Sequence, residues 1–206
     1  MMKQLLLTLL LFPFLLNASA QEVSDTTFVD LSELSNAFAY DMRYATENNF
    51  LKEQVYDCPK CLLRKEAADA LIKANELFRE KGYRIKLFDC YRPLDIQKKM
   101  WEIYPNATYV ANPYKSGSIH NRGLAVDLTI EKLDGTSVEM GTDFDFFGEA
   151  AHHDYNKLPY EVIENRLLLK NTLESVGFRP ISSEWWHYNF NSPNKYVPAN
   201  TPLDCN

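Results

Sequence analysis

The sequence predicts an α+β domain with a central, mainly antiparallel sheet flanked by helices. Three observations carry this prediction. Apolar residues recur at helical spacing in separate segments, apolar and polar residues alternate after Gly123, and turn-forming residues between segments favour hairpins. No repeat and no low-complexity linker divides the chain, so residues 21–206 are expected to form one domain.

The N-terminal part of this domain is expected to be mostly irregular, followed by a helix. Residues 25–60 show only short extended pieces, near 28–30 and 39–44. Apolar side chains at three- and four-residue spacing predict a helix over residues 62–81. Gly82 closes this helix, because glycine accepts the left-handed backbone that ends many helices.

A strand, a second helix and a loop come next. The strand is predicted over residues 84–89 and is broken by the sequence Tyr-Arg-Pro at 91–93. The second helix is predicted over residues 94–103. Residues 104–118 contain two prolines and a glycine, and we expect a loop there.

The residues after Gly123 predict a strand with two different faces. One face carries an apolar row, formed by Leu124, Val126, Leu128 and Ile130. The opposite face carries Ala125, Asp127 and Thr129. The sequence Leu-Asp-Gly-Thr at 133–136 predicts a turn, with a hairpin partner around 137–140. A third helix is expected over 160–175, followed by a strand-like, aromatic-rich segment over 184–190.

The first twenty residues have the pattern of a secretory signal peptide. Lys3 precedes an apolar run over 5–16, and Ala-Ser-Ala follows at 18–20. The run is too short for a membrane span of about 20 residues, and no Cys follows that could carry a lipid anchor. Cleavage after Ala20 predicts an exported chain without a stable membrane anchor; an uncleaved anchor is the alternative.

Composition restricts the partners of the chain. The formal net charge is −6 at pH 7, which argues against a nucleic-acid partner because such a partner calls for a basic face. Aromatic residues make up 13% of the chain, and we expect some to line a binding cleft.

The chain has four cysteines, Cys58, Cys61, Cys90 and Cys205, which leave three disulfide connectivities open. In an exported chain we expect structural disulfides. The sequence Cys-Pro-Lys-Cys at 58–61 fits half of a zinc ribbon or a redox pair as well. A ribbon needs a second close pair, which the chain lacks, and a thioredoxin-like motif needs a preceding strand.

A histidine and an aspartate around the predicted strand fit a metal site. Asp127 lies on the face opposite the apolar row, beside small neighbours that leave room for a pocket. A carboxylate in such a place is costly unless a cation or several donors meet it. His120 precedes the strand, and Gly123 allows a turn that brings both side chains together. The alternative is an Asp127 bound to backbone amides and an exposed His120.

A second cluster, Glu-Trp-Trp-His at 184–187, completes the arrangement that a hydrolytic zinc requires. Such a zinc takes three protein ligands and a nearby carboxylate that removes a proton from water. His120, Asp127 and His187 would be the ligands, and Glu184 the base. Residues three apart in a regular strand face opposite ways, so Glu184 must precede the strand or a bulge must intervene.

The adjacent pair His152 and His153 is the competing histidine cluster. Neighbouring histidines do not easily bind one metal ion, and this pair lies in a polar stretch. We expect loop residues, with an accessory or regulatory metal as the alternative.

Several spaced motifs together resemble the zinc D-Ala-D-Ala peptidases that share a fold with hedgehog signalling domains. The finer matches resemble the D-alanyl-D-alanine dipeptidases of the VanX type. The likeness runs from about residue 28 to 190 and rests on Asp-Met-Arg-Tyr-Ala-Thr at 41–46, Asp-Cys-Tyr-Arg-Pro at 89–93, Ser-x-His-x-x-Gly-x-Ala-x-Asp at 118–127, Met-Gly-Thr at 140–142 with Phe-Asp at 144–145, and Glu-Trp-Trp-His-Tyr at 184–188.

The resemblance implies a metallopeptidase with one Zn²⁺ per chain that cleaves the dipeptide D-Ala-D-Ala. It implies that Arg92 stabilises the oxyanion, that Asp145 holds the substrate's amino group, and that Ser118 and Tyr44 contact the dipeptide. The physical argument agrees for the first two, because a free dipeptide carries opposite charges at its ends. Otherwise Arg92 would form a surface salt bridge, and Asp145 would cap a helix at residues 146–147.

Two other functions stay open. The same zinc site serves D,D-carboxypeptidases that trim cell-wall stem peptides, and the fold can also serve as a zinc-bearing binding module without catalysis. Glu184 argues against the binding module, which has no use for a base. In an exported enzyme, D-Ala-D-Ala released by cell-wall turnover is the expected substrate.

Overall fold

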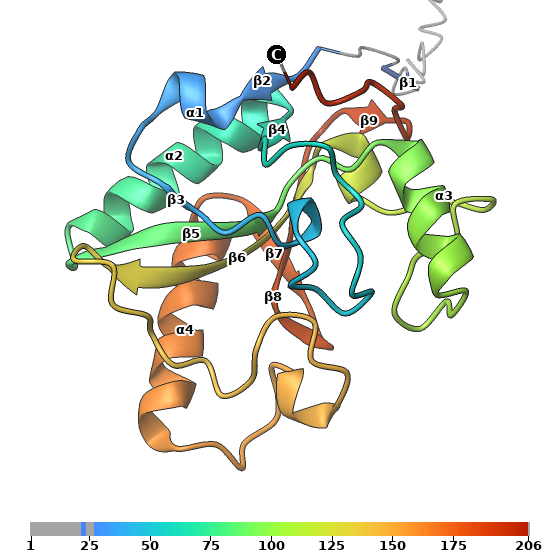
Figure 1. The fold of residues 1–206 in the computed structure, drawn as a ribbon. Coiled ribbons are helices and arrows are strands. Elements are labelled where there is room, and N and C mark those ends of the chain that lie inside the picture. The colour runs from blue at the N-terminus through green and yellow to red at the C-terminus, as the bar shows by residue number, and fades with distance from the viewer. Residues whose placement is uncertain (1–21, 24–26, 206) are drawn as a thin grey trace, which may run out of the picture.

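A five-stranded sheet with the order β3-β5-β6-β8-β7 forms the centre of the molecule (Figure 1). The structure is a computed structural model that describes residues 22–23 and 27–205, so the predicted signal peptide lies outside the described residues. β3 pairs with β5 in parallel, and the other neighbours are antiparallel. The predicted α+β class and mainly antiparallel sheet are therefore confirmed. The five strands are β3 (Ala39–Tyr40), β5 (Tyr83–Asp89), β6 (Ala125–Lys132), β7 (Phe178–Ile181) and β8 (Glu184–Phe190).

Two short pairs of strands and several helices surround this sheet. β2 (Val29–Asp30) pairs with β4 (Leu62–Leu63), and β1 (Glu22–Val23) with β9 (Lys195–Tyr196). The helices are α1 (Leu31–Leu34), α2 (Lys65–Arg79), α3 (Leu94–Ile103) and α4 (Tyr160–Ser175), with 3₁₀ turns η1 (Arg43–Ala45), η2 (His120–Arg122) and η3 (Glu149–Ala151).

The two longest helices share one face of the sheet. α2 packs on β5, α4 packs on β7 and β8, and the two helices touch each other. Val126, Leu128 and Ile130 of β6 are fully buried in the same cluster as the inward residues of both helices, which include Leu71, Phe78, Leu169 and Leu173. Burial of each such side chain contributes about 1.5–3 kcal/mol. Since the apolar row is used on this side, Asp127 points to the other side of the sheet.

The predicted helices form with small differences in their ends. α3 and α4 have the predicted bounds. α2 begins three residues later than predicted, because Leu62 and Leu63 pair with β2 instead of joining the helix. Gly82 has φ +85°, the left-handed backbone expected after α2.

The predicted hairpin partner at residues 137–140 is wrong. Only one isolated bridge, between Glu131 and Ser137, continues the sheet there. The chain turns away because the carbonyl oxygen of Met140 accepts a hydrogen bond from Nε of Arg166, on α4, at 2.7 Å. The extended piece expected over 39–44 is also shorter than predicted and gives way to η1.

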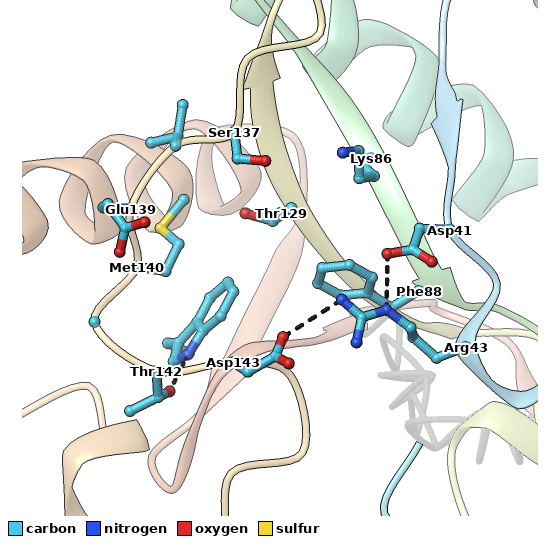
Figure 2. A pocket seen from close by; sticks show the side chains of 13 residues that line it. Asp41, Arg43, Lys86, Phe88, Thr129, Ser137, Glu139, Met140, Thr142 and Asp143 are labelled. Atoms are coloured by element: carbon cyan, nitrogen blue, oxygen red, sulfur yellow. Dashed lines mark hydrogen bonds and ion pairs between the residues drawn. The ribbon is translucent and has the colours of Figure 1, made fainter. Parts of the chain in front are cut away.

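A cavity of about 450 Å³ lies beside β5, β6 and residues 137–143 (Figure 2). Arg43 points into it between Asp41 and Asp143, with N–O distances of 2.7 and 3.4 Å. Trp185 forms another part of the wall, and its Nε1 donates a hydrogen bond to Oγ1 of Thr142 at 2.8 Å. The charge of Arg43 is thus neutralised by the protein itself.

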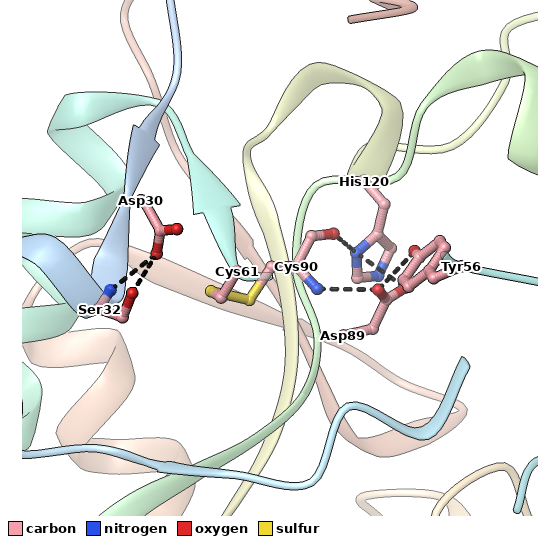
Figure 3. Close-up of a disulfide and its surroundings, with 7 residues drawn as sticks. All are labelled: Asp30, Ser32, Tyr56, Cys61, Asp89, Cys90 and His120. Carbon is pink, nitrogen blue, oxygen red and sulfur yellow. Dashed lines mark hydrogen bonds and ion pairs between the residues drawn. A yellow bond between two sulfur atoms is a disulfide. The ribbon is translucent and has the colours of Figure 1, made fainter. Parts of the chain in front are cut away.

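Two disulfides join segments that are distant in sequence: Cys58–Cys205 and Cys61–Cys90. The expectation of structural disulfides is confirmed, and the residues of the Cys-Pro-Lys-Cys sequence each bond elsewhere. Figure 3 shows Cys61–Cys90 next to Asp89 and His120. None of the helices within the described residues has the length and apolar character of a membrane span.

Candidate active site

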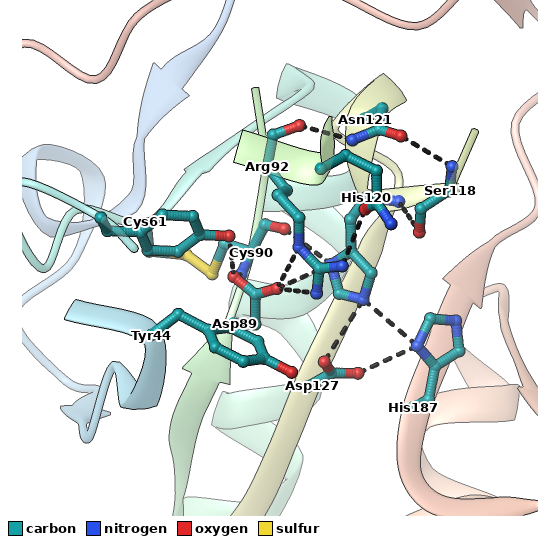
Figure 4. Close-up of polar contacts among 12 residues, drawn as sticks. Tyr44, Cys61, Asp89, Cys90, Arg92, Ser118, His120, Asn121, Asp127 and His187 are labelled. Atoms are coloured by element: carbon teal, nitrogen blue, oxygen red, sulfur yellow. Dashed lines mark hydrogen bonds and ion pairs between the residues drawn. A yellow bond between two sulfur atoms is a disulfide. The ribbon is translucent and has the colours of Figure 1, made fainter. Parts of the chain in front are cut away.

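Three neighbouring strands place polar residues in one row across the sheet. Asp127 on β6 is paired with Asp89 on β5 and with His187 on β8. All three side chains are buried, at 0%, 4% and 8% exposure for Asp89, Asp127 and His187. Figure 4 shows them converging on the face of the sheet that the helices leave open.

His120 joins this row from η2, just before β6. Gly123 ends η2 with φ +70°, and a Cβ there would lie 2.5 Å from the ring of Phe28, so the turn requires glycine. The turn holds Nε2 of His120 at 3.4 Å from Asp127 Oδ2 and 3.2 Å from His187 Nδ1. The structure thus brings the three predicted metal ligands together, with one ligand atom from each within 4.8 Å of the others.

The hydrogen bonds on the far side of each imidazole favour metal binding. Nδ1 of His120 donates to the carbonyl oxygen of Cys90 at 2.7 Å, and Nε2 of His187 to Oδ1 of Asn189 at 2.9 Å. Each ring therefore turns its other nitrogen toward Asp127 and the opposite ring, and in the neutral imidazole this nitrogen carries the lone pair that can bind a metal ion. Two imidazoles and a carboxylate that converge in this way attract a cation, either a proton shared between His187 and Asp127 or a metal ion, and the donor set suits zinc.

The electrostatics of the group also favour a cation. Burial alone would raise the pKa of Asp127, but His120 and His187 hold that pKa well below its usual range. Burial alone would lower the pKa of His187, but its hydrogen bond to Asp127 raises it to about 8. Asp127 thus remains a carboxylate and attracts positive charge to this point.

Glu184 lies at the edge of the metal-capable group. It is the first residue of β8, and the pairing with β7 shifts between Pro180 and Ile181, so β8 bulges after Glu184. The bulge resolves the geometric conflict, because Glu184 and His187 both reach the site, with 4.0 Å between Oε2 and Nδ1. Burial raises the pKa of Glu184, which suits a group that exchanges protons near neutral pH.

Arg92 is held rigidly beside the same group. Its guanidinium contacts Oδ2 of Asp89 through Nη2 at 2.6 Å and through Nε at 3.2 Å, and its Nη1 donates to Oε1 of Gln97 at 2.9 Å. Asp89 is fixed in turn by the hydroxyl of Tyr56 at 2.6 Å. Arg92 is 6% exposed, so the alternative of a surface salt bridge is wrong. Although burial alone would lower the pKa of Arg92, Asp89 raises it, and the side chain keeps its charge.

Asp145 offers a second, half-buried carboxyl in the same cavity. Its backbone has φ +58°, a strained conformation for a residue other than glycine, and the hydroxyl of Tyr44 donates to its Oδ2 at 2.9 Å. Burial, with the charge of Asp127, raises the pKa of Asp145 well above its usual range. A cationic ligand would reverse this shift. The alternative of a helix cap is wrong, because residues 146–147 are not helical.

The cavity that contains these groups measures about 300 Å³. Ser118 lies in its wall, and its hydroxyl accepts a hydrogen bond from the backbone N–H of His120 at 3.2 Å. The eight residues that the sequence predicts as metal ligands, catalytic groups or substrate contacts all line this cavity: Tyr44, Arg92, Ser118, His120, Asp127, Asp145, Glu184 and His187.

His152 and His153 lie in a bend and turn after η3, as expected for loop residues. Neither belongs to the metal-capable group found among the described residues. The ring of His153 instead meets the edge of Tyr188, with 6.0 Å between centroids. Burial lowers the pKa of His153 to about 4, so it is neutral at neutral pH.

Sequence reasoning missed several residues of the site. Asp89 and Asn189 support Arg92 and His187, and Tyr109 and Phe147 form part of the cavity wall. Asn189 has a readable signal, because residues two apart in a strand share a face. The two aromatic residues have none, since their loops meet only in the folded chain.

The chain is similar to known proteins of one family. The family model described as D-ala-D-ala dipeptidase matches residues 24–201. The D-alanyl-D-alanine dipeptidase of Escherichia coli (strain K12) is 35% identical over 184 residues, which cover 89% of this chain and 95% of that protein. The D-alanyl-D-alanine dipeptidase of Enterococcus faecium is 34% identical over 181 residues, covering 78% and 90%.

Among solved structures, VanYB in complex with D-Alanine-D-Alanine matches at 18% identity with a TM-score of 0.44, over 64% of this chain and 73% of that one. The family model covers most of the chain, and the two curated relatives are matched over nearly their whole length. This chain belongs to the D-alanyl-D-alanine dipeptidase family of zinc metallopeptidases.

Proposed function

We propose that the protein hydrolyses the free dipeptide D-alanyl-D-alanine to two molecules of D-alanine, with one zinc ion held by His120, Asp127 and His187. The observation that carries the proposal is one small cavity that combines a metal-capable group, Glu184 and a separate half-buried carboxyl, Asp145. The substrate is suggested by the names of the curated relatives.

The two ends of the substrate have matching partners in the cavity. Asp145 would hold the free ammonium group, and its interaction with Tyr44 fixes the direction of the carboxylate. Tyr44 and Ser118 would also contact the dipeptide. The cation at Asp145 would restore the ionised carboxylate that burial disfavours.

Zinc, when bound, supplies a Lewis acid that polarises a carbonyl and makes water acidic. Glu184 would accept the proton of the attacking water, whose oxygen bonds to the carbonyl carbon of the peptide. Arg92 would donate to the carbonyl oxygen as it gains negative charge; its contacts with Asp89 and Gln97 use three of its five N–H groups. Glu184 then returns the proton to the leaving amine, and the C–N bond breaks.

Release of free amino groups from three substrates tests the proposal. The zinc-loaded protein is incubated with D-Ala-D-Ala, with L-Ala-L-Ala, and with a pentapeptide that ends in D-Ala-D-Ala. Cleavage of the free D,D-dipeptide alone is the expected result. Cleavage of the pentapeptide alone would identify a D,D-carboxypeptidase, and no cleavage of any substrate would favour a zinc-bearing binding module.

We further propose that residues 1–20 are removed on export and that the enzyme acts on dipeptide released by cell-wall turnover. The two disulfides support export, because such bonds persist mainly in oxidising compartments. Sequencing the N-terminus of the protein purified from a periplasmic or secreted fraction should give a chain that starts at Gln21. An active protein confined to the cytosol would contradict this proposal.

A further inference from the structure

We propose that Tyr109 and Phe147 form an aromatic bridge across the cavity and thereby exclude peptides that extend beyond the amino group of a dipeptide. This inference rests on the proposed function, since it requires Asp145 to hold the substrate's ammonium group. It assigns specificity for free dipeptides to two residues that come from different loops.

The two rings stack directly on each other. Their centroids lie 3.9 Å apart with an interplanar angle of 19°. Tyr109 lies in the loop between α3 and η2, and Phe147 lies between β6 and η3. Both residues line the cavity that contains the metal-capable group. Because they belong to different loops, their contact spans the cavity wall where these loops meet.

Further aromatic side chains support the bridge from outside the cavity. Phe50 packs against Phe147 with 5.0 Å between centroids and against Tyr104 with 5.7 Å. Tyr104 also lies 6.2 Å from Phe147 and 6.3 Å from Tyr109. The backbone N–H of Tyr109 donates to the carbonyl oxygen of Asn106 at 3.0 Å. Three loops are therefore joined through one set of rings, which favours a fixed wall.

The position of Asp145 explains why this wall would select by length. Asp145 precedes Phe147 by two residues, and its left-handed backbone turns its carboxyl into the cavity, where Tyr44 holds it. A dipeptide whose ammonium group contacts Asp145 ends there. A longer peptide would replace the ammonium with an amide and would have to continue past the part of the cavity wall that Phe147 and Tyr109 form.

The bridge is built to be partly exposed. Tyr109 and Phe147 are 40% and 37% exposed, so the pair has one side toward the cavity and another toward solvent. Tyr104, also 37% exposed, contacts both rings, so the three side chains form one exposed aromatic patch. A contiguous apolar patch, unlike a single exposed ring, is typical of a ligand- or partner-binding surface. A wall at the mouth of a small substrate cavity accounts for their placement.

Substitutions Phe147→Ala and Tyr109→Ala, alone and together, test the bridge. We measure kcat/KM for D-Ala-D-Ala and for a tripeptide and a pentapeptide that end in D-Ala-D-Ala. The expected result is an increase of about 10-fold or more in the ratio of long to short substrate, largest in the double variant, because an opened wall admits the longer chain. Phe147→Leu and Tyr109→Phe keep bulk at each position and should stay near the wild-type ratio.

Two matched controls separate the bridge from general effects on the loops. Phe146 and Tyr114 are 46% and 66% exposed, lie in the same two loops and do not line the cavity. Phe146→Ala and Tyr114→Ala should leave the substrate ratio unchanged. Zinc content and thermal unfolding of every variant identify those that fail to fold. If one alanine variant fails, the other single alanine variant still tests the bridge, and Phe147→Val or Tyr109→Leu removes most of the ring with a smaller loss of packing.

An unchanged ratio in folded alanine variants that still cleave D-Ala-D-Ala would overturn the inference and leave the proposed function intact. A wild-type protein that cleaves the pentapeptide as fast as the dipeptide would also overturn it. A wild-type protein that cleaves none of these substrates while it binds zinc would reject the proposed function, and the inference with it.

Discussion

The carbonyl oxygen of Cys90 accepts a hydrogen bond from Nδ1 of His120 at 2.7 Å. Cys90 is bonded to Cys61, so a disulfide fixes the backbone that orients a proposed zinc ligand (Figures 3 and 4). The adjacent Asp89 holds Arg92. One covalent link therefore supports both the metal-capable group and the cation beside it.

Removal of this disulfide should weaken zinc binding. In Cys61→Ala/Cys90→Ala, we expect a loss of about 2–5 kcal/mol in the free energy of unfolding, as is usual for a native disulfide. Zinc affinity should also fall by about 10-fold or more, because the carbonyl that orients His120 is no longer fixed. Denaturant unfolding and competition with a chromophoric chelator measure the two effects.

The other disulfide is the matched control. Cys205 is exposed near the C-terminus and its bond to Cys58 contacts no ligand of the group. Cys58→Ala/Cys205→Ala should lower stability and leave zinc affinity unchanged. Equal losses of zinc affinity in the two double variants would contradict a specific role for Cys90.

Asn189 should support zinc binding from the other side. Its Oδ1 accepts from Nε2 of His187 at 2.9 Å and so leaves Nδ1 free as a ligand atom. Asn189→Ala should lower zinc affinity by about 10- to 100-fold, whereas Asn189→Asp keeps an acceptor and should retain most of it. The exposed Asn191 serves as the control position, and Asn191→Ala should have no effect in the same chelator competition.

Asp145→Asn should separate substrate binding from stability. Loss of the carboxylate should lower kcat/KM for D-Ala-D-Ala by about 10- to 100-fold, because the variant loses a charge-assisted hydrogen bond to the substrate's ammonium group. Stability should not fall, because asparagine also accepts a left-handed backbone and carries no charge that burial penalises. A variant with full activity on the free dipeptide would contradict the role proposed for Asp145.

His153 should make the folded state less stable in mild acid. Burial lowers its pKa to about 4, below the usual value of about 6.5. Between these two pKa values His153 is protonated in the unfolded chain and neutral in the folded chain. The free energy of unfolding therefore falls as pH decreases from about 6.5 to about 4. His153→Gln removes this contribution. The difference in melting temperature between wild type and variant should change across this range and be constant above pH 7; a constant difference throughout would exclude the effect.

The sequence allowed prediction of the parts of the site that depend on local pattern. Alternation along residues 124–130 places Asp127 opposite the apolar row, and Gly123 brings His120 to it; both hold in the structure. The conflict between Glu184 and His187 could be recognised from strand geometry, but the choice of a bulge depended on how β8 pairs with β7.

Elements that depend on distant partners could not be predicted. The hairpin at 137–140 fails because Arg166, on a later helix, binds Met140. β7 is absent from the sequence predictions. It contains Pro180, which a strand accepts here because β7 lies at the edge of the sheet. The disulfide pairing likewise depends on segments that meet only after folding.

The most direct test of the central claim compares Glu184→Gln with His187→Ala in parallel measurements of bound zinc and of D-Ala-D-Ala hydrolysis. We predict that Glu184→Gln keeps one zinc per chain and loses about 10²-fold or more in kcat, because only the proton acceptor is removed. His187→Ala should lose both zinc and activity. Near wild-type hydrolysis by Glu184→Gln, with zinc bound, would contradict Glu184 as the base and the mechanism built on it.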